Sequence, residues 1–145
     1  AAYDYQDNTF HSHPGYYIDY FEMRLAQLQG LHNLHYEIKK IRKMPKQALV
    51  IADYIMYMAD YVVEMNIPDQ QIEKLEEISE QMKQEELPKT REEFEGRALL
   101  YHILMDLEEF LVYKKRFVNG LDEKKLRIYW KQEMEQKDSA NELQK

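Results

Sequence analysis

The sequence predicts an all-α fold, specifically an antiparallel up-down four-helix bundle with an additional C-terminal amphipathic helix. Apolar residues recur at three- and four-residue spacings over four long segments, which is typical of amphipathic helices. Corners of only a few residues separate these segments, and short connections favour antiparallel neighbours. The chain contains just 4 glycines and 4 prolines, and the prolines fall at the corners. No segment is a good candidate for a β-strand.

The composition fits about one domain of 145 residues. Its net charge of -7 argues against nucleic acid as a partner, because binding to phosphate depends on lysine and arginine. The absence of cysteine excludes disulfides and thiolate catalysis, and fits a reducing compartment. No apolar run approaches the roughly 20 residues of a membrane span. Because the chain begins with Ala1 instead of methionine, we expect it to belong to a longer protein.

The first predicted helix covers residues 16 to 43 and follows a flexible leader over residues 1 to 15. Its apolar stripe continues into two histidines and consists of Ile18, Phe21, Leu25, Leu28, His32 and His35. Met44 and Pro45 end the helix, because the residue before a proline is disfavoured in the α region.

The second predicted helix covers residues 46 to 65 and is apolar around almost its whole circumference. A helix of this kind is expected to be central or to lie at an interface. The third predicted helix, over residues 69 to 86, has one apolar stripe and an acidic outer face that we expect to be solvated. The stripe consists of Ile72, Leu75, Ile78 and Met82.

The fourth predicted helix covers residues 91 to 119 and starts at a capping box. The Thr90 hydroxyl is expected to accept the backbone N–H of Glu93, whose carboxylate reaches back to the N–H of Thr90. Gly120 is expected to adopt the left-handed conformation of a helix C-cap. Residues 121 to 145 are predicted to form a short tail helix and a frayed C-terminus.

The fourth helix carries the polar residues that most suggest a binding site. Its core-facing seam is predicted to run through Phe94, Arg97, Ala98, Tyr101, Leu104, Met105, Glu108, Leu111 and Val112. Arg97 and Glu108 lie roughly 16 Å apart along such a helix, so each needs its own partner. One interpretation is that Arg97, Tyr101 and Glu108 bind a ligand, with Arg97 holding a carboxylate. The favoured alternative is structural: Arg97 pairs with an acid on the first or second helix, or extends to water.

Metal binding has only weak candidates. His32 and His35 share one helix face at a spacing of three residues, and His102 on the fourth helix is a possible third ligand. The Glu-x-x-His pairs that build di-iron bundles are absent. His11 and His13, near the N-terminus, are interpreted as incidental. We therefore expect neither a metal nor another cofactor.

The tail combines basic and aromatic residues, an arrangement that can lie on an anionic membrane or contact a partner. The candidate contact residues are Lys124, Arg127, Tyr129, Trp130 and Lys131. Docking of the tail on the bundle or on a second subunit is the favoured alternative. No serine has a histidine or acid placed for a catalytic triad, and no glycine-rich phosphate loop is present. We expect no enzymatic activity.

Residues 87–98, with the sequence LPKTREEFEGRA, are followed by LLYHIL at 99–104 and EEFL at 108–111. This stretch resembles the C-terminal domain of the putative aromatic acid exporter family of Gram-positive membrane proteins. The resemblance implies an N-terminal membrane part and a cytoplasmic helical domain at the cell membrane, in a protein that exports aromatic acids or similar small anions. It supplies no catalytic residues.

We expect this chain to act as an interaction or regulatory module of such a protein. The resemblance implies its own N-terminal membrane domain as a partner, and from the residues we expect a second copy and the membrane surface as possible partners. An N-terminal connection to the membrane would place the corner at 66–69 and the tail near the bilayer, with the basic residues 39–46 at the far end. The alternative from the residues alone is a stand-alone soluble bundle that binds a small anion or a metal.

Overall fold

The computed structural model describes residues 14–130, 139, 140 and 142–144. This part of the chain forms five helices and no strand, which confirms the all-α prediction. The helices are α2 (Pro14–Lys39), α3 (Ala48–Ala59), α4 (Asp69–Lys83), α5 (Arg91–Asn119) and α6 (Glu123–Tyr129). None of the described helices combines the length and apolar character needed to cross a membrane.

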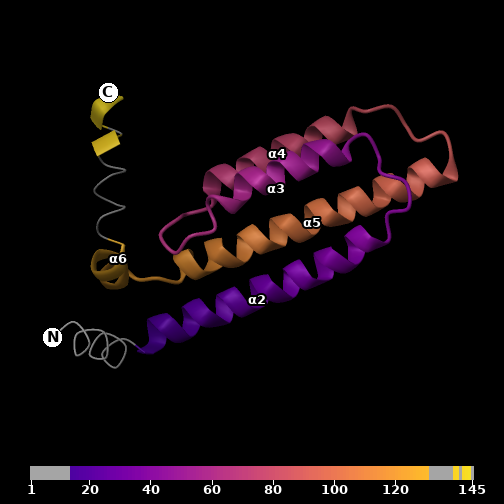
Figure 1. Cartoon of the computed structure of the whole chain (residues 1–145). Coiled ribbons are helices and arrows are strands. Elements are labelled where there is room, and N and C mark those ends of the chain that lie inside the picture. The colour runs from indigo at the N-terminus through magenta and orange to yellow at the C-terminus, as the bar shows by residue number, and fades with distance from the viewer. Residues whose placement is uncertain (1–13, 131–138, 141, 145) are drawn as a thin grey trace.

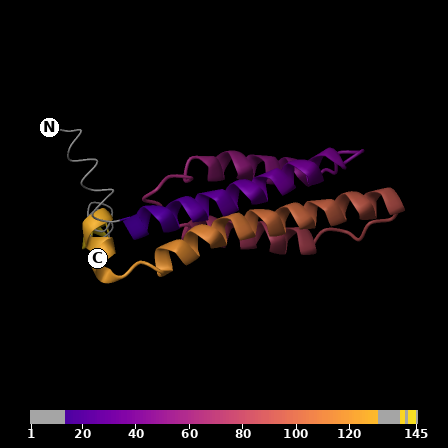
Figure 2. The same cartoon turned by 90° about the horizontal axis from the view of Figure 1, so that it is seen from below.

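The four longer helices form an antiparallel bundle (Figure 1). The two longest helices, α2 and α5, pack against each other, α4 packs on α5, and α3 packs on α4. Figure 2 shows the same arrangement from below, with α2 and α5 side by side. The start of α2, the α3–α4 connection and the end of α5 lie at one end of the bundle. The α2–α3 and α4–α5 connections lie at the other end.

The core has two parts. The larger one lies between α3, α4 and α5 and includes Tyr54, Leu75, Leu100 and Leu107, with Leu34 from α2. The smaller one lies at the end of the bundle where the chain enters and leaves it, and combines buried residues from α2, the end of α5 and the tail. Its buried members are Tyr16, Met23, Phe117, Val118 and Trp130.

The start of α5 contains half of the predicted capping box. The Thr90 hydroxyl accepts the backbone N–H of Glu93 at 3.1 Å, as expected. The Glu93 carboxylate accepts the N–H of Lys89 at 2.9 Å, one residue before the predicted donor. At the other end of α5, the predicted left-handed C-cap is wrong. Gly120 has a φ of -79°, and its N–H donates to the last carbonyls of the helix.

Helix α3 is shorter and less buried than its sequence suggests. It spans Ala48–Ala59, whereas residues 46 to 65 were predicted. Leu49 and Met56 on its outer side are 71% and 74% exposed. The prediction of a central position is therefore wrong for the described bundle, because α3 packs chiefly on α4 and lies at an edge.

Candidate functional site

The buried face of α5 agrees with the predicted seam only in part, since Leu104 and Leu111 are buried as predicted but other members of the seam are not. Phe94 and Met105, both predicted to face the core, are 63% and 64% exposed. The centre of the buried apolar stripe lies roughly 120° around the helix from the centre of the predicted seam, at about 100° per residue. The residues of the buried stripe are Leu100, Ile103, Leu104, Leu107, Phe110 and Leu111. The sequence pattern allowed both stripes, and the bulkier aliphatic one packs inward.

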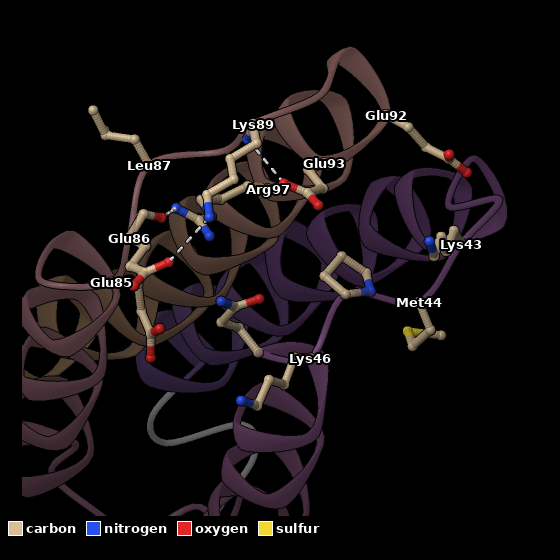
Figure 3. A pocket seen from close by; sticks show the side chains of 12 residues that line it. Lys43, Met44, Lys46, Glu85, Glu86, Leu87, Lys89, Glu92, Glu93 and Arg97 are labelled. Carbon is tan, nitrogen blue, oxygen red and sulfur yellow. Dashed lines mark hydrogen bonds and ion pairs between the residues drawn. The ribbon is translucent and has the colours of Figure 1, made fainter.

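Arg97 lines a cavity of about 600 Å³ at the far end of the bundle (Figure 3). The cavity lies between the α2–α3 connection, the α4–α5 connection and the start of α5. One Arg97 Nη donates a hydrogen bond to the backbone carbonyl of Glu86. Arg97 is thus partly exposed and held by a loop. This fits a structural role better than an interior contact with an anion. Its hydrogen-bond partner is a backbone carbonyl of the α4–α5 connection and not the predicted acid on the first or second helix.

The charges around this cavity are mixed. Its cationic side chains are Lys43, Lys46, Lys89 and Arg97, and its acidic ones are Glu85, Glu86, Glu92 and Glu93. Four positive and four negative groups give no net attraction for an anion. The prediction placed Arg97 among the apolar positions of a core-facing seam, whereas it lies beside the connecting loops, whose conformations could not be read from helical periodicity.

The structure does not bring the three candidate ligand-binding residues into one site. Tyr101 is half-buried and packs against the main core. Glu108 is exposed and lines a separate groove between α4 and α5, with Glu76, Glu80 and Lys83 among its neighbours. Tyr101 follows Arg97 by one turn on the same side of α5 but does not line the Arg97 cavity, and Glu108 lies roughly 16 Å from Arg97 along the axis.

The histidines also remain separate. His32 and His35 are exposed on α2, and the His32 ring contacts Tyr36. His102 Nε2 lies 3.6 Å from an Asp106 carboxylate oxygen and 3.9 Å from Glu37. Burial raises the pKa of Asp106, and the nearby His102 opposes this shift. No group of three or more potential metal ligands occurs among the described residues, and His11 and His13 lie outside them.

The tail docks on the bundle through Trp130, which is 1% exposed. Its indole N–H donates to the Tyr16 hydroxyl at 3.2 Å. The expectation that Trp130 contacts a membrane is therefore wrong for this structure, and the docking alternative holds for this residue. Lys124 is exposed. Lys131 and the side chains of Arg127 and Tyr129 lie outside the described part.

The docked tail covers a polar network that the sequence did not reveal. Tyr16 donates its hydroxyl hydrogen to Glu64 at 2.7 Å, and Lys114 Nζ donates to the carbonyl of Val63 at 2.7 Å. Lys114 is 4% exposed, and its ammonium lies 5.5 Å from the Trp130 ring centroid. Burial and, to a lesser extent, the nearby charge of Arg24 lower the pKa of Lys114 to about 8, while the Glu64 carboxylate opposes this shift. The sequence offered one indication of this network, because Lys114 follows Leu107 and Leu111 at the spacing of residues on one buried helix face.

The outer face of α2 is an exposed apolar surface. We use this name for Ile18, Phe21, Leu25, Leu28, His32 and His35, the stripe predicted to face the core. The four apolar members are 51%, 54%, 65% and 60% exposed in that order. The core prediction is wrong because α2 packs on α5 through another stripe, formed by Tyr16, Met23, Gln27 and Leu34. Gln27 fixes that contact by donating its amide to the Phe110 carbonyl at 2.9 Å.

Comparison with known proteins identifies the family. The model of the "putative aromatic acid exporter C-terminal domain" matches residues 1–115. The chain belongs to this family. The chain is also 32% identical to the uncharacterised protein YqjA of Bacillus subtilis strain 168, over 98 residues that make up 68% of the chain. It spans only 30% of that relative's length. No solved structure matches it.

Membership confirms the resemblance read from residues 87–98 and the stretch after it. In this exporter-family domain, those residues form the α4–α5 connection and the first turns of α5. Several of them line the cavity of Figure 3. The outer face of α2 lies within the matched residues too, so the family model spans both surfaces.

Proposed function

We propose that the chain is the cytosolic C-terminal domain of an integral membrane protein that exports aromatic acids or similar small anions. The family match over residues 1–115 carries this proposal. The matched relative is more than three times as long as the matched segment, which leaves room for a membrane-embedded part. The antiparallel bundle fits attachment at one end, because the start of α2 lies at the end opposite the α4–α5 connection.

Within that protein, the domain works by contact with other parts or copies and is not itself an enzyme. The outer face of α2 supports this role, because an apolar helical stripe with no described element over it is typical of an interaction surface. The charge-balanced cavity around Arg97 offers less support for capture of a free anion.

The proposal is tested on the full-length protein in cells. We expect the full-length protein in the membrane fraction and the 145-residue chain alone in the soluble fraction. A C-terminal fluorescent-protein fusion is expected to fluoresce, since this reporter matures in the cytoplasm. A full-length protein recovered in the soluble fraction would contradict membrane attachment, and an active C-terminal alkaline phosphatase fusion would contradict the cytosolic side.

The regulatory part needs a transport measurement. Cells that express the full-length protein are loaded with a labelled aromatic acid, and its efflux is compared with that from cells that express a version lacking this domain. We expect the deletion to change the rate or concentration dependence of efflux while the membrane part still inserts. Unchanged efflux would argue against an interaction or regulatory role.

A further inference from the structure

The outer face of α2 follows the heptad pattern of a coiled coil. Its residues are separated by alternating steps of three and four, and every one of them is exposed. In heptad notation, position a holds Ile18, Leu25 and His32, and position d holds Phe21, Leu28 and His35. Regular heptads bury a seam against another helix.

The bundle does not use this seam to form its own core. A helix needs one apolar stripe to join a core, and α2 already packs on α5 through Met23 and Leu34. Leu31, Tyr36 and Ile38 widen the outer face and are 39%, 55% and 41% exposed. Seven large apolar side chains are then exposed on this face: Ile18, Phe21, Leu25, Leu28, Leu31, Tyr36 and Ile38. At roughly 100 Å² for each, they leave on the order of 700 Å² of apolar surface uncovered. The largest patch of a monomer is about 300–600 Å², and a standard interface takes about 800 Å² from each partner.

We propose that the outer face of α2 pairs with the same face of a second copy, in a parallel and in-register two-stranded coiled coil. Ile18, Phe21, Leu25 and Leu28 then form four successive apolar layers with their own counterparts. The pair is short, but the bundle already holds α2 as a helix, so pairing does not include the cost of helix nucleation. Two copies held in one membrane would also have a raised effective concentration.

The parallel direction rests on the proposed function. The matched family is a C-terminal domain, so the membrane part would join before α2. Two copies in one membrane must then bring both α2 helices in from the same side. The antiparallel pair that matches a with d positions and keeps the four apolar residues together would set Phe21 opposite Leu25. The two Phe21 residues would then be displaced by about 6 Å along the axis, and the two N-termini would leave from opposite ends.

The residues beside the seam are compatible with the parallel register. A parallel pair brings each g residue near the following e residue of its partner. This places Tyr17 near Glu22 and Arg24 near Gln29, so no like charges meet beside the apolar layers. His32 and His35 form polar layers at the far end, which can specify register at a cost in stability. Lys39 occupies the next a position and ends the seam with two like charges.

Cysteine cross-linking tests both the pairing and its direction, because the 145-residue chain contains no cysteine. We expect the Phe21→Cys variant to form a disulfide-linked dimer under mild oxidation. Leu49→Cys is the control, since Leu49 is exposed on α3 away from the seam. Linkage of Phe21→Cys only when it is mixed with Leu25→Cys would overturn the parallel direction. Linkage of Phe21→Cys no faster than that of the control would overturn the pairing.

Sedimentation equilibrium on the cysteine-free chain gives an independent measurement. We expect a reversible dimer whose dissociation constant rises about tenfold or more in Leu25→Glu. Leu49→Glu is the matched control and is expected to leave it unchanged. Both leucines are at least 65% exposed, so both variants should keep their helical circular dichroism. A monomer at all concentrations would overturn the pairing, whereas a soluble full-length protein would overturn the proposed function instead.

Discussion

Replacing Lys114 with methionine should remove most of the alkaline rise in stability that this lysine causes. Burial lowers its pKa from 10.5 to about 8 in the folded chain. The unfolded chain therefore binds more protons between these values, so stability should increase with pH in that range. The full shift corresponds to roughly 3 kcal/mol. Between pH 7 and pH 9.5, the wild type should gain about 2 kcal/mol more than Lys114→Met.

Urea unfolding followed by circular dichroism at pH 7 and pH 9.5 measures this difference directly. The comparison between variants cancels the titration of tyrosines and other groups that both proteins share. Lys115→Met is the matched control, because Lys115 is 42% exposed and pairs with Asp69 at the surface. Lys115→Met should keep the wild-type rise in the free energy of unfolding between pH 7 and pH 9.5. Equal changes in wild type and Lys114→Met would refute the account of Lys114 as a buried ammonium.

Substitutions at four further positions test the local structure by thermal or urea unfolding. Trp130→Ala should destabilise the chain by about 3 kcal/mol, because it empties a buried site, and an unchanged midpoint would show that the tail does not dock. Thr90→Ala should cost about 1 kcal/mol through the lost helix cap, and Thr90→Ser should restore most of it. Gly30→Ala should stabilise α2 by about 0.5–1 kcal/mol, since its Cβ meets nothing within 4 Å. Gly96→Ala should gain less, because its Cβ would lie 3.0 Å from Pro45, and equal gains would contradict this contact.

Periodicity and corner residues were enough to predict the helices but not the faces they bury. Thr90 marked the start of α5 because a cap is a local interaction between neighbours in sequence. The buried stripe of α5 was misassigned because Leu100 and Leu107 share that helix with exposed apolar residues such as Phe94 and Met105. Periodicity shows that a stripe is apolar, but not which surface covers it.

The same limit explains what was missed at the candidate sites. The outer face of α2 was read as core because heptad spacing is the same whether the partner helix belongs to this chain or to another. The network around Lys114 depends on Tyr16, Glu64 and Trp130, which lie far apart in sequence. A lysine on an apolar stripe was a visible signal, but its partners were not. The cavity around Arg97 depends on loop conformations that carry no periodicity.

The central claim, that this is the cytosolic domain of a membrane protein, is tested most directly by labelling in intact cells. Leu87 is 84% exposed in the α4–α5 connection, at the end of the bundle away from the proposed attachment. In a full-length protein without other cysteines, Leu87→Cys should react with a membrane-impermeant maleimide only after the cells are permeabilised, and should be recovered in the membrane fraction. Labelling in intact cells, or recovery in the soluble fraction, would contradict the account.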